Sequence, residues 1–378
     1  MIGNVSTLIG NLLNSKAQTL VNTVNCVGVM GKGIALEFKI RFPEMYHDYL
    51  QKCKREEVKL GKPYLYKESG LPWILNFPTK DHWRSVSRIK DIKKGLRYLK
   101  EYYKRWGIQS LAVPPLGCGH GQLEWKVVGR TLYRYLSQFD IPVELYAPHD
   151  TPAEELQLDF LAQIELSEAS ASRVSNLKAI KPAWIAFVEI LSRLEREPYS
   201  WPVGRTTFQK IAYVVTRLGI SSGLNYRKGS YGPFSPDMKK VITRLDNNGV
   251  IREERLGNMF QVKVGPTFED ARQNYIEELD RWETKLDKIS DLFVRVNTKQ
   301  AEIVAAVLYI YDELKSSGTS TISEADVLTQ VMNWKQRRRP PLYEGEVANT
   351  IRNLAALHWL DVEGSPQLPV SVGEFDVV

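Results

Sequence analysis

Two asparagines, Asn22 and Asn25, lie at the end of an apolar run and directly before a glycine-rich segment. The run spans residues 19–24, and residues 28–33 read Gly-Val-Met-Gly-Lys-Gly. Glycines let the backbone approach a ligand, and the first N–H groups of a helix are unpaired donors with partial positive charge. Amide groups suit ribose hydroxyls better than they suit a metal ion. The segment therefore predicts a phosphate or nucleotide site.

A second glycine-rich segment follows another apolar run. Residues 117–121 read Gly-Cys-Gly-His-Gly and come after the strand-like residues 110–113. Neither segment has the spacing of the dinucleotide fingerprint or of the P-loop. In open α/β sheets, ligands bind outside the carboxyl ends of the strands, where both segments would fall. Two such loops are stronger evidence for a ligand site than one.

The elements that must position these loops alternate along the first 150 residues. Apolar periodicity predicts strands and helices in turn, and so an α/β fold with a mixed or parallel sheet covered by helices on both faces. Strands are expected at 5–9, 19–24, 64–66, 73–77, 110–113 and 143–147, and helices at 34–42, 43–54, 89–106 and 123–139.

The rest of the chain is expected to be mainly helical. Residues 153–178 are acidic and then rich in small residues, as in a helical tail followed by a linker. Three helical patterns and a β-hairpin around Gly257 predict a winged-helix-like unit at about 179–290. Three further helical patterns predict a second unit at about 298–365. We therefore expect domains at 1–152 and 179–378.

Charge and cysteine content limit the class of protein. The net charge is +7, with 23 Lys+Arg against 13 Asp+Glu in residues 1–150 (+10) and 28 against 31 in the remainder (−3). The basic part suits a nucleic acid, although a solvated lysine-rich surface would have the same composition. The sequence shows no membrane span or signal peptide. Three cysteines without C-x-x-C spacing argue against a disulfide framework or a zinc site, and favour the cytoplasm.

The two glycine loops together resemble the macrodomain family, which binds ADP-ribose, over residues 1–150. The resemblance implies an adenine contact near Asn11, a distal-ribose contact at Asn25 and phosphate loops at 31–35 and 117–121. It implies no metal and no cofactor, with ADP-ribose as ligand or product. The implied ADP-ribose site comprises Asn11, Leu12, Asn22, Asn25, Gly28, Gly31, Lys32, Gly33, Ile34, Ala35, Leu116, Gly117, Cys118, Gly119, His120 and Gly121.

Each asparagine has a structural alternative. Asn11 can cap a short helix instead of contacting the adenine. Asn22 and Asn25 can bond to their own backbone in turns. Because the glycine loop follows directly, we favour ligand contact for Asn25 and for Asn22.

Residues 77–84, Phe-Pro-Thr-Lys-Asp-His-Trp-Arg, narrow the resemblance. They resemble the DarG family of DNA ADP-ribosyl glycohydrolases, antitoxins that reverse thymidine ADP-ribosylation by DarT toxins. The resemblance implies a catalytic role for Lys80, although a single lysine after a strand is usually solvated. Its amine could attack the anomeric carbon and form a Schiff-base-type intermediate, or assist electrostatically. Relatives use an aspartate where this chain has Gly121, so His120 is the second catalytic candidate.

The expected function is that of an antitoxin. The macrodomain would hydrolyse the N-glycosidic bond between ADP-ribose and thymidine in single-stranded DNA. The acidic C-terminal region would bind and inhibit a cationic DarT-type toxin. Two alternatives stay open: a non-catalytic ADP-ribose reader, and an ADP-ribose-responsive winged-helix transcription regulator.

Overall fold

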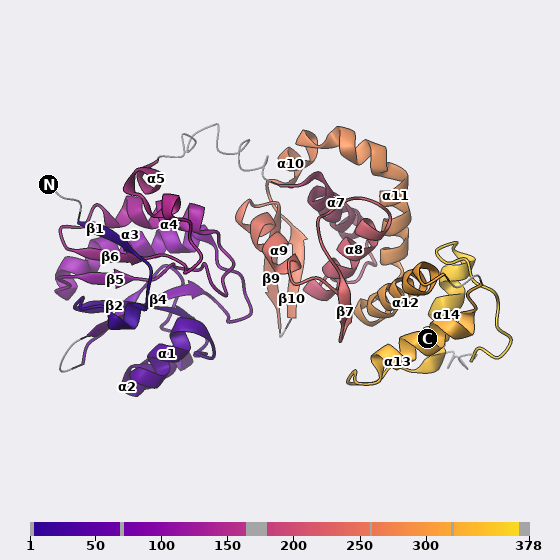
Figure 1. Ribbon diagram of the computed structural model, residues 1–378, viewed down its shortest axis with the longest axis horizontal. Coiled ribbons are helices and arrows are strands. Elements are labelled where there is room, and N and C mark those ends of the chain that lie inside the picture. Colours follow the sequence, from indigo (N-terminus) through magenta and orange to yellow (C-terminus); the bar gives the residue numbers. More distant parts are fainter. Residues whose placement is uncertain (1–3, 69–71, 164–179, 258, 319–320, 370–378) are drawn as a thin grey trace. The chain divides into compact units, whose positions relative to one another are not determined.

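The computed structural model describes residues 4–68, 72–163, 180–257, 259–318 and 321–369 (Figure 1). The chain divides into two compact units, residues 1–174 and 175–378. Within the expected linker, residues 153–163 include the short helices η2 (Ala153–Leu156) and α5 (Leu158–Ala162). The remainder of that linker lies outside the described residues.

The N-terminal unit is built on a mixed sheet. Five of its strands are parallel, and β3 pairs antiparallel with β4. In spatial order the strands are β1 (Val5–Leu8), β6 (Val143–Tyr146), β5 (Leu111–Val113), β2 (Thr19–Asn25), β4 (Trp73–Lys80) and β3 (Tyr64–Tyr66). This arrangement confirms the predicted fold class for residues 1–150.

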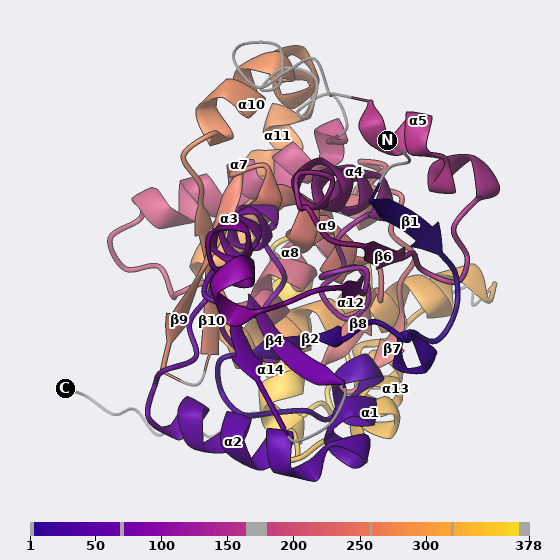
Figure 2. The ribbon, with the colours of Figure 1, turned by 90° about the vertical axis from the view of Figure 1, so that its left-hand side faces the viewer.

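Helices cover both faces of this sheet, as Figure 2 shows. One face carries α3 (Ile89–Trp106) and α4 (Trp125–Leu136), and the other carries α1 (Gly33–Arg41) and α2 (Pro43–Lys54). Successive residues of a strand point to opposite faces, so a strand covered on both sides is apolar throughout. Leu20 accordingly belongs to the core beside α1 and α2, and Val21 to the core beside α3 and α4. Burying one such side chain is worth about 1.5–3 kcal/mol.

Helix α3 has the residue bounds that its periodicity predicted. Its apolar stripe is buried, and the helix ends where Gly107 takes a left-handed conformation with φ of 78°. A residue with a Cβ would be strained there, so the glycine sets the end of the helix. The 3-10 helix η1 (Leu12–Asn14) follows β1 in the same unit.

The C-terminal unit is mainly helical. The expected hairpin is present, with Leu256 paired to Met259, whereas the winged-helix assignment stays a prediction. The elements are α7 (Pro182–Arg196), α8 (Arg205–Arg217), β7 (Arg227–Gly229), β8 (Gly232–Phe234), α9 (Met238–Asn247), β9 (Ile251–Leu256), β10 (Met259–Val264), α10 (Phe268–Asn274), α11 (Ile276–Val294), α12 (Thr298–Ser316), α13 (Glu324–Lys335) and α14 (Glu344–Ala356). Among the described residues, no helix is both long and apolar enough to span a membrane.

Candidate functional site

Three neighbouring parallel strands end at one edge of the N-terminal sheet. Strand β2 lies between β5 and β4, and each of the three leads into a loop. The glycine-rich residues 26–32 follow β2, residues 81–88 follow β4, and residues 114–124 follow β5. In the register of β2 and β4, Asn25 pairs with Lys80. The fold thus places two residues that are far apart in sequence side by side at this edge.

Lys80 is buried, with 9% of its surface exposed. Its Nζ donates a 2.6 Å hydrogen bond to the backbone carbonyl of His120, which belongs to the loop after β5. An ammonium or amine leaves water only where protein groups replace its hydrogen bonds. Lys80 is therefore not the solvated lysine that its position after a strand would favour.

The His120 side chain lies against the first residue of α1. A Cβ built on Gly33 would be 3.6 Å from Cδ2 and 3.8 Å from Nε2 of the imidazole. Gly33 also has a φ of 59°, which disfavours any residue with a Cβ. The loop after β5 thus meets both Lys80 and the helix N-terminus, where unpaired N–H groups favour an anion.

Asn25 organises the glycine-rich loop. Its Oδ1 accepts hydrogen bonds from the N–H groups of Val27 (3.0 Å) and Val29 (3.3 Å), and its Nδ2 donates to the Val29 carbonyl (2.5 Å). The hydroxyl of Tyr49 in α2 donates to the Asn25 carbonyl at 2.8 Å. Asn25 therefore makes the hydrogen bonds that the turn-forming alternative predicts, and its contact with a ligand stays a prediction.

Asn22 lies inside the sheet rather than at its edge. It is fully buried, and its Nδ2 donates a 3.0 Å hydrogen bond to Oδ1 of Asn76 in β4. The structure does not bring Asn22 to the surface of the loops, because it precedes the end of β2 by three residues. Sequence reasoning missed Asn76, although a polar residue within an apolar run was a usable signal.

Asn11 caps the short helix η1. Its Oδ1 accepts a 3.0 Å hydrogen bond from the N–H of Leu13, while Leu12 is buried in the core beside α1 and α2. Arg41 Nη1 donates to the Leu13 carbonyl at 3.1 Å and so joins η1 to the end of α1. The capping alternative thus matches the contacts of Asn11, and an adenine contact stays a prediction.

Gly121 leaves no room for a side chain. A Cβ at this position would lie 2.3 Å from the Gly117 carbonyl oxygen and 2.3 Å from Oγ of Ser87. The N–H of Ser87 also donates to the Gly121 carbonyl at 3.3 Å. An aspartate is therefore incompatible with this backbone. Ser87, which joins the loops after β4 and β5, was not singled out by the sequence.

The other predicted residues of the two loops differ in exposure. Lys32 is exposed and precedes the first residue of α1, whereas Leu116 is fully buried. Burial raises the pKa of the Cys118 thiol to about 12. Burial, the Cys53 thiol and the carboxylate of Asp81 raise the pKa of Cys26 to about 12. Both cysteines are thus protonated at neutral pH and are poor nucleophiles.

An exposed aromatic ring stands three residues after Lys80. Trp83 is 47% exposed, and its ring stacks with His82 at a centroid distance of 5.5 Å. The guanidinium of Arg84 lies 4.5 Å from the centroid of the same ring. This loop therefore presents an aromatic and cationic surface beside Lys80.

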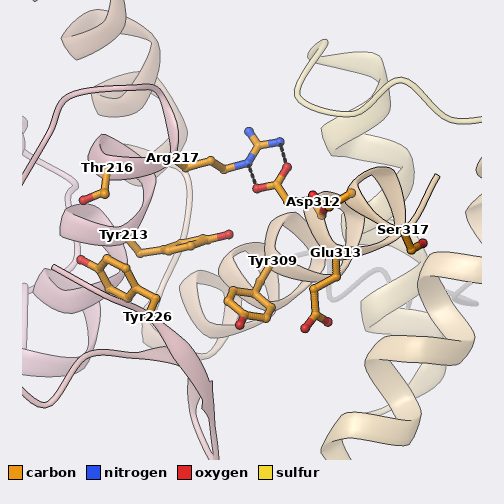
Figure 3. Close-up of a pocket in the computed structure, with 9 residues that line it drawn as sticks. Tyr213, Thr216, Arg217, Tyr226, Tyr309, Asp312, Glu313 and Ser317 are labelled. Carbon is orange, nitrogen blue, oxygen red and sulfur yellow. Dashed lines mark hydrogen bonds and ion pairs between the residues drawn. The ribbon is translucent and has the colours of Figure 1, made fainter. Parts of the chain in front are cut away.

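The C-terminal unit contains a separate cleft of about 540 Å³. Figure 3 shows Arg217 of α8 paired with Asp312 of α12 through two hydrogen bonds of 2.7 and 2.9 Å. The cleft is lined by Tyr213, Thr216, Arg217, Tyr226, Tyr309, Asp312, Glu313, Ser316 and Ser317. None of the residues expected to bind ADP-ribose belongs to it.

Comparisons with known proteins agree with this geometry. Residues 21–132 match the model of the Macro domain. The chain is 27% identical to a DNA ADP-ribosyl glycohydrolase of Thermus aquaticus, over 97% of this chain and 98% of that protein. It is 34% identical to a DNA ADP-ribosyl glycohydrolase of Mycobacterium tuberculosis, over 63% of this chain and 66% of that protein. The predicted fold class and the DarG resemblance are thereby confirmed.

A third relative joins two activities in one chain. It is the DNA ADP-ribosyl transferase–DNA ADP-ribosyl glycohydrolase fusion protein of Thermosipho africanus, 46% identical over 41% of this chain. This chain spans 45% of the length of that fusion protein.

Proposed function

We propose that this macrodomain protein, which is similar along its whole length to a DNA ADP-ribosyl glycohydrolase, removes ADP-ribose from thymidine in single-stranded DNA. The bond to be broken joins the anomeric carbon of the distal ribose to a thymine nitrogen. Water supplies the hydroxyl that the anomeric carbon gains, and the thymine nitrogen takes up a proton. The reaction needs no cofactor, and we expect it in the cytoplasm.

The observation that carries the proposal is the position of Lys80. The side chain is buried at the junction of the loops after β4 and β5, next to Asn25 and within reach of the His120 carbonyl. A protein that only held ADP-ribose would need donors for the phosphates and ribose, but no buried amine at this junction. A buried amine can attack an anomeric carbon or stabilise charge on the departing group.

The surrounding loops supply the binding contacts. The N-terminus of α1, with Gly33 and the adjacent Lys32, favours the diphosphate through N–H groups and positive charge. The imidazole of His120 lies over Gly33, where it can contact a phosphate or the leaving base. The exposed ring of Trp83 offers a stacking surface for a base held near Lys80.

We also propose that the C-terminal unit binds and inhibits a DarT-type DNA ADP-ribosyltransferase. Two observations support this part. The Thermosipho africanus relative carries a DNA ADP-ribosyl transferase and a glycohydrolase in one chain. Residues 151–378 of this chain have 28 Lys+Arg against 31 Asp+Glu, and this acidic balance suits a cationic DNA-binding partner.

The deciding experiment measures release of ADP-ribose from thymidine-ADP-ribosylated single-stranded DNA. The intact protein is compared with Lys80→Ala and Lys80→Arg, and ADP-ribose affinity is measured by calorimetry in each. We expect turnover to fall at least 100-fold in both variants, because a positioned acid–base group contributes about 10²–10⁴ and an electrostatic donor about 10²–10³, while ADP-ribose still binds.

Two outcomes would change the assignment. ADP-ribose binding without any release by the intact protein would make the chain a reader. Tight binding of a defined DNA duplex that responds to ADP-ribose would favour the transcription regulator. Borohydride added during turnover separates the two roles of Lys80, because it reduces a Schiff base to a stable adduct and leaves an electrostatic contact unchanged.

A further inference from the structure

The outer face of helix α3 carries much of the positive charge of the N-terminal unit. The helix contains seven lysines and arginines against two acidic residues, a net charge of +5. Its exposed cations are Lys90, Lys94, Arg97, Lys100, Lys104 and Arg105. The acidic residue exposed on the same helix is Glu101. The mechanism proposed above uses none of these side chains.

Part of this charge arrangement does not favour the helix itself. Lys90 and Lys94 stand four residues apart, as do Lys100 and Lys104, and like charges at this spacing destabilise a helix. Lys104 pairs with Asp140 at 2.5 Å. Lys100 and Arg97 have neutral partners, the side chains of Gln138 and Tyr135. Lys104 and Arg105 suit the C-terminal end of the helix dipole, so the departure from local stability rules is confined to the like-charge pairs. Such a departure without a gain in the core is typical of a functional surface.

A row of aromatic rings runs beside the exposed cations. Tyr98, Tyr102 and Trp106 follow one another at intervals of four residues, so they lie on one stripe of the helix. Ring centroids are 4.3 Å apart for the two tyrosines and 5.7 Å apart for Tyr102 and Trp106. All three side chains are half-buried. The packing thus holds the rings in place and leaves part of each in contact with water.

Positive charge beside aromatic rings suits a single-stranded nucleic acid. Cations contact the phosphates, and rings contact bases that are not hidden in a duplex. A duplex or a lipid surface would use the cations but would present no bases to the rings.

The helix also starts at the candidate active site. Ile89 follows directly on the loop 81–88, and a Cβ on Gly117 would lie 3.2 Å from Cδ1 of Ile92. Tyr98 stands nine residues after Ile89, which corresponds to about 14 Å along the helix axis. A single-stranded nucleic acid lying on this face would therefore reach the loops around Lys80 within a few nucleotides.

We propose that the outer face of α3 binds the single-stranded DNA next to the modified thymidine. Its lysines and arginines hold the phosphates, and the row formed by Tyr98, Tyr102 and Trp106 contacts neighbouring bases. The identity of the nucleic acid rests on the glycohydrolase function proposed above, whereas binding of an unmodified strand can be measured without it.

The test uses the full chain and a fluorescein-labelled, unmodified dT20 oligonucleotide, with anisotropy measured between 50 and 200 mM salt. The α3 variant is Lys90→Gln/Lys94→Gln/Arg105→Gln. The matched control, Lys16→Gln/Lys54→Gln/Arg55→Gln, removes the same charge from exposed positions outside α3. We expect the α3 variant to bind at least tenfold more weakly at 50 mM salt, and the control to stay within twofold. The slope of the logarithm of the binding constant against the logarithm of the salt concentration should become shallower by about 2, because each phosphate contact contributes about 0.7.

A second variant tests the aromatic row. Tyr98→Leu keeps an apolar side chain with a high helix propensity, so it separates stacking from folding. We expect dT20 affinity to fall at least fivefold with the salt slope unchanged. Circular dichroism melting of every variant checks that the chain is folded.

Steady-state kinetics test whether the outer face of α3 contributes to binding of the modified substrate. With an ADP-ribosylated oligonucleotide, the α3 triple variant should raise KM at least tenfold and keep kcat within twofold. Equal loss of dT20 binding in both triple variants, or duplex binding as tight as single-strand binding, would overturn the α3 proposal. Hydrolysis by a protein whose dT20 binding does not depend on α3 would contradict the α3 proposal and leave the glycohydrolase function intact. Binding of dT20 through α3 without hydrolysis would contradict the glycohydrolase function and support α3 as a binding surface for single-stranded DNA.

Discussion

Lys80 donates its hydrogen bond to the main-chain carbonyl of His120, and the imidazole of the same residue lies over Gly33. One residue of the loop after β5 thus contacts the candidate catalytic lysine and the first turn of α1. Mutation can separate the contribution of the His120 carbonyl from the contribution of its imidazole.

His120→Ala removes the imidazole and keeps the carbonyl that accepts from Lys80. We expect ADP-ribose affinity to fall several-fold, because the ring over Gly33 is lost, while kcat falls less than tenfold and far less than in Lys80→Ala. Steady-state kinetics between pH 5 and 9 measure both effects. A loss in kcat above about 100-fold, with one limb of the pH profile gone, would instead make the imidazole the general acid or base.

Gly121→Ala should destabilise the N-terminal unit and disrupt the ADP-ribose site. The new Cβ would meet the Gly117 carbonyl oxygen and Ser87 Oγ at 2.3 Å, so both loops must move. Overpacking of this kind costs about 1–3 kcal/mol. The control is Gly119→Ala, whose Cβ would have no neighbour within 4 Å. Thermal melting and ADP-ribose calorimetry should separate the two variants, and equal behaviour would show that the loops can relax.

Asn25→Ala should unfold the glycine-rich loop locally. It removes the acceptor of the N–H groups of Val27 and Val29, and a typical intramolecular hydrogen bond contributes about 0.5–1.5 kcal/mol. Asn25→Asp retains the acceptor and loses the donor to the Val29 carbonyl, so it should cost less. Denaturant unfolding ranks the variants. If both variants keep full stability and lose only ADP-ribose binding, the ligand-contact interpretation of Asn25 is the better one.

Lys210 should make the stability of the C-terminal unit depend on pH. Burial and the charge of Lys335 lower its pKa to about 7, and its Nζ donates to the Pro233 carbonyl at 2.7 Å. Between pH 7 and about 10.5 the unfolded state binds a proton that the native state has released, so stability rises with pH by at most about 1.4 kcal/mol per unit. Below pH 7 both states are protonated, and this contribution is constant.

The measurement compares the wild type with Lys210→Met between pH 6 and 9. The difference in unfolding free energy should shift in favour of the wild type as the pH rises above 7. Parallel curves across this range would mean that Lys210 keeps its charge in the native state, held by the nearby carboxylate of Glu302.

The sequence by itself determined most of the elements and the edge at which the loops meet. Apolar periodicity located β2, α3 and most helices of the C-terminal unit, because burial of one face or both leaves a period that local inspection can detect. It did not predict α10 (Phe268–Asn274) or the long helix α11 (Ile276–Val294). Gly107 marked the end of α3, because glycine readily takes the left-handed conformation that ends a helix. Glycine-rich segments after two strands indicated a ligand site before any fold was known.

Only the tertiary structure decided which candidate side chains meet. Asn22 and Asn25 look alike in sequence, yet one pairs with Asn76 inside the sheet and the other shapes the loop. Lys80 looked like a solvated lysine until strand register set it beside Asn25 and loop packing set it beside His120. Such contacts join residues tens of positions apart, and burial and hydrogen-bond satisfaction depend on all the neighbours at once. Local pattern contains no information about those neighbours.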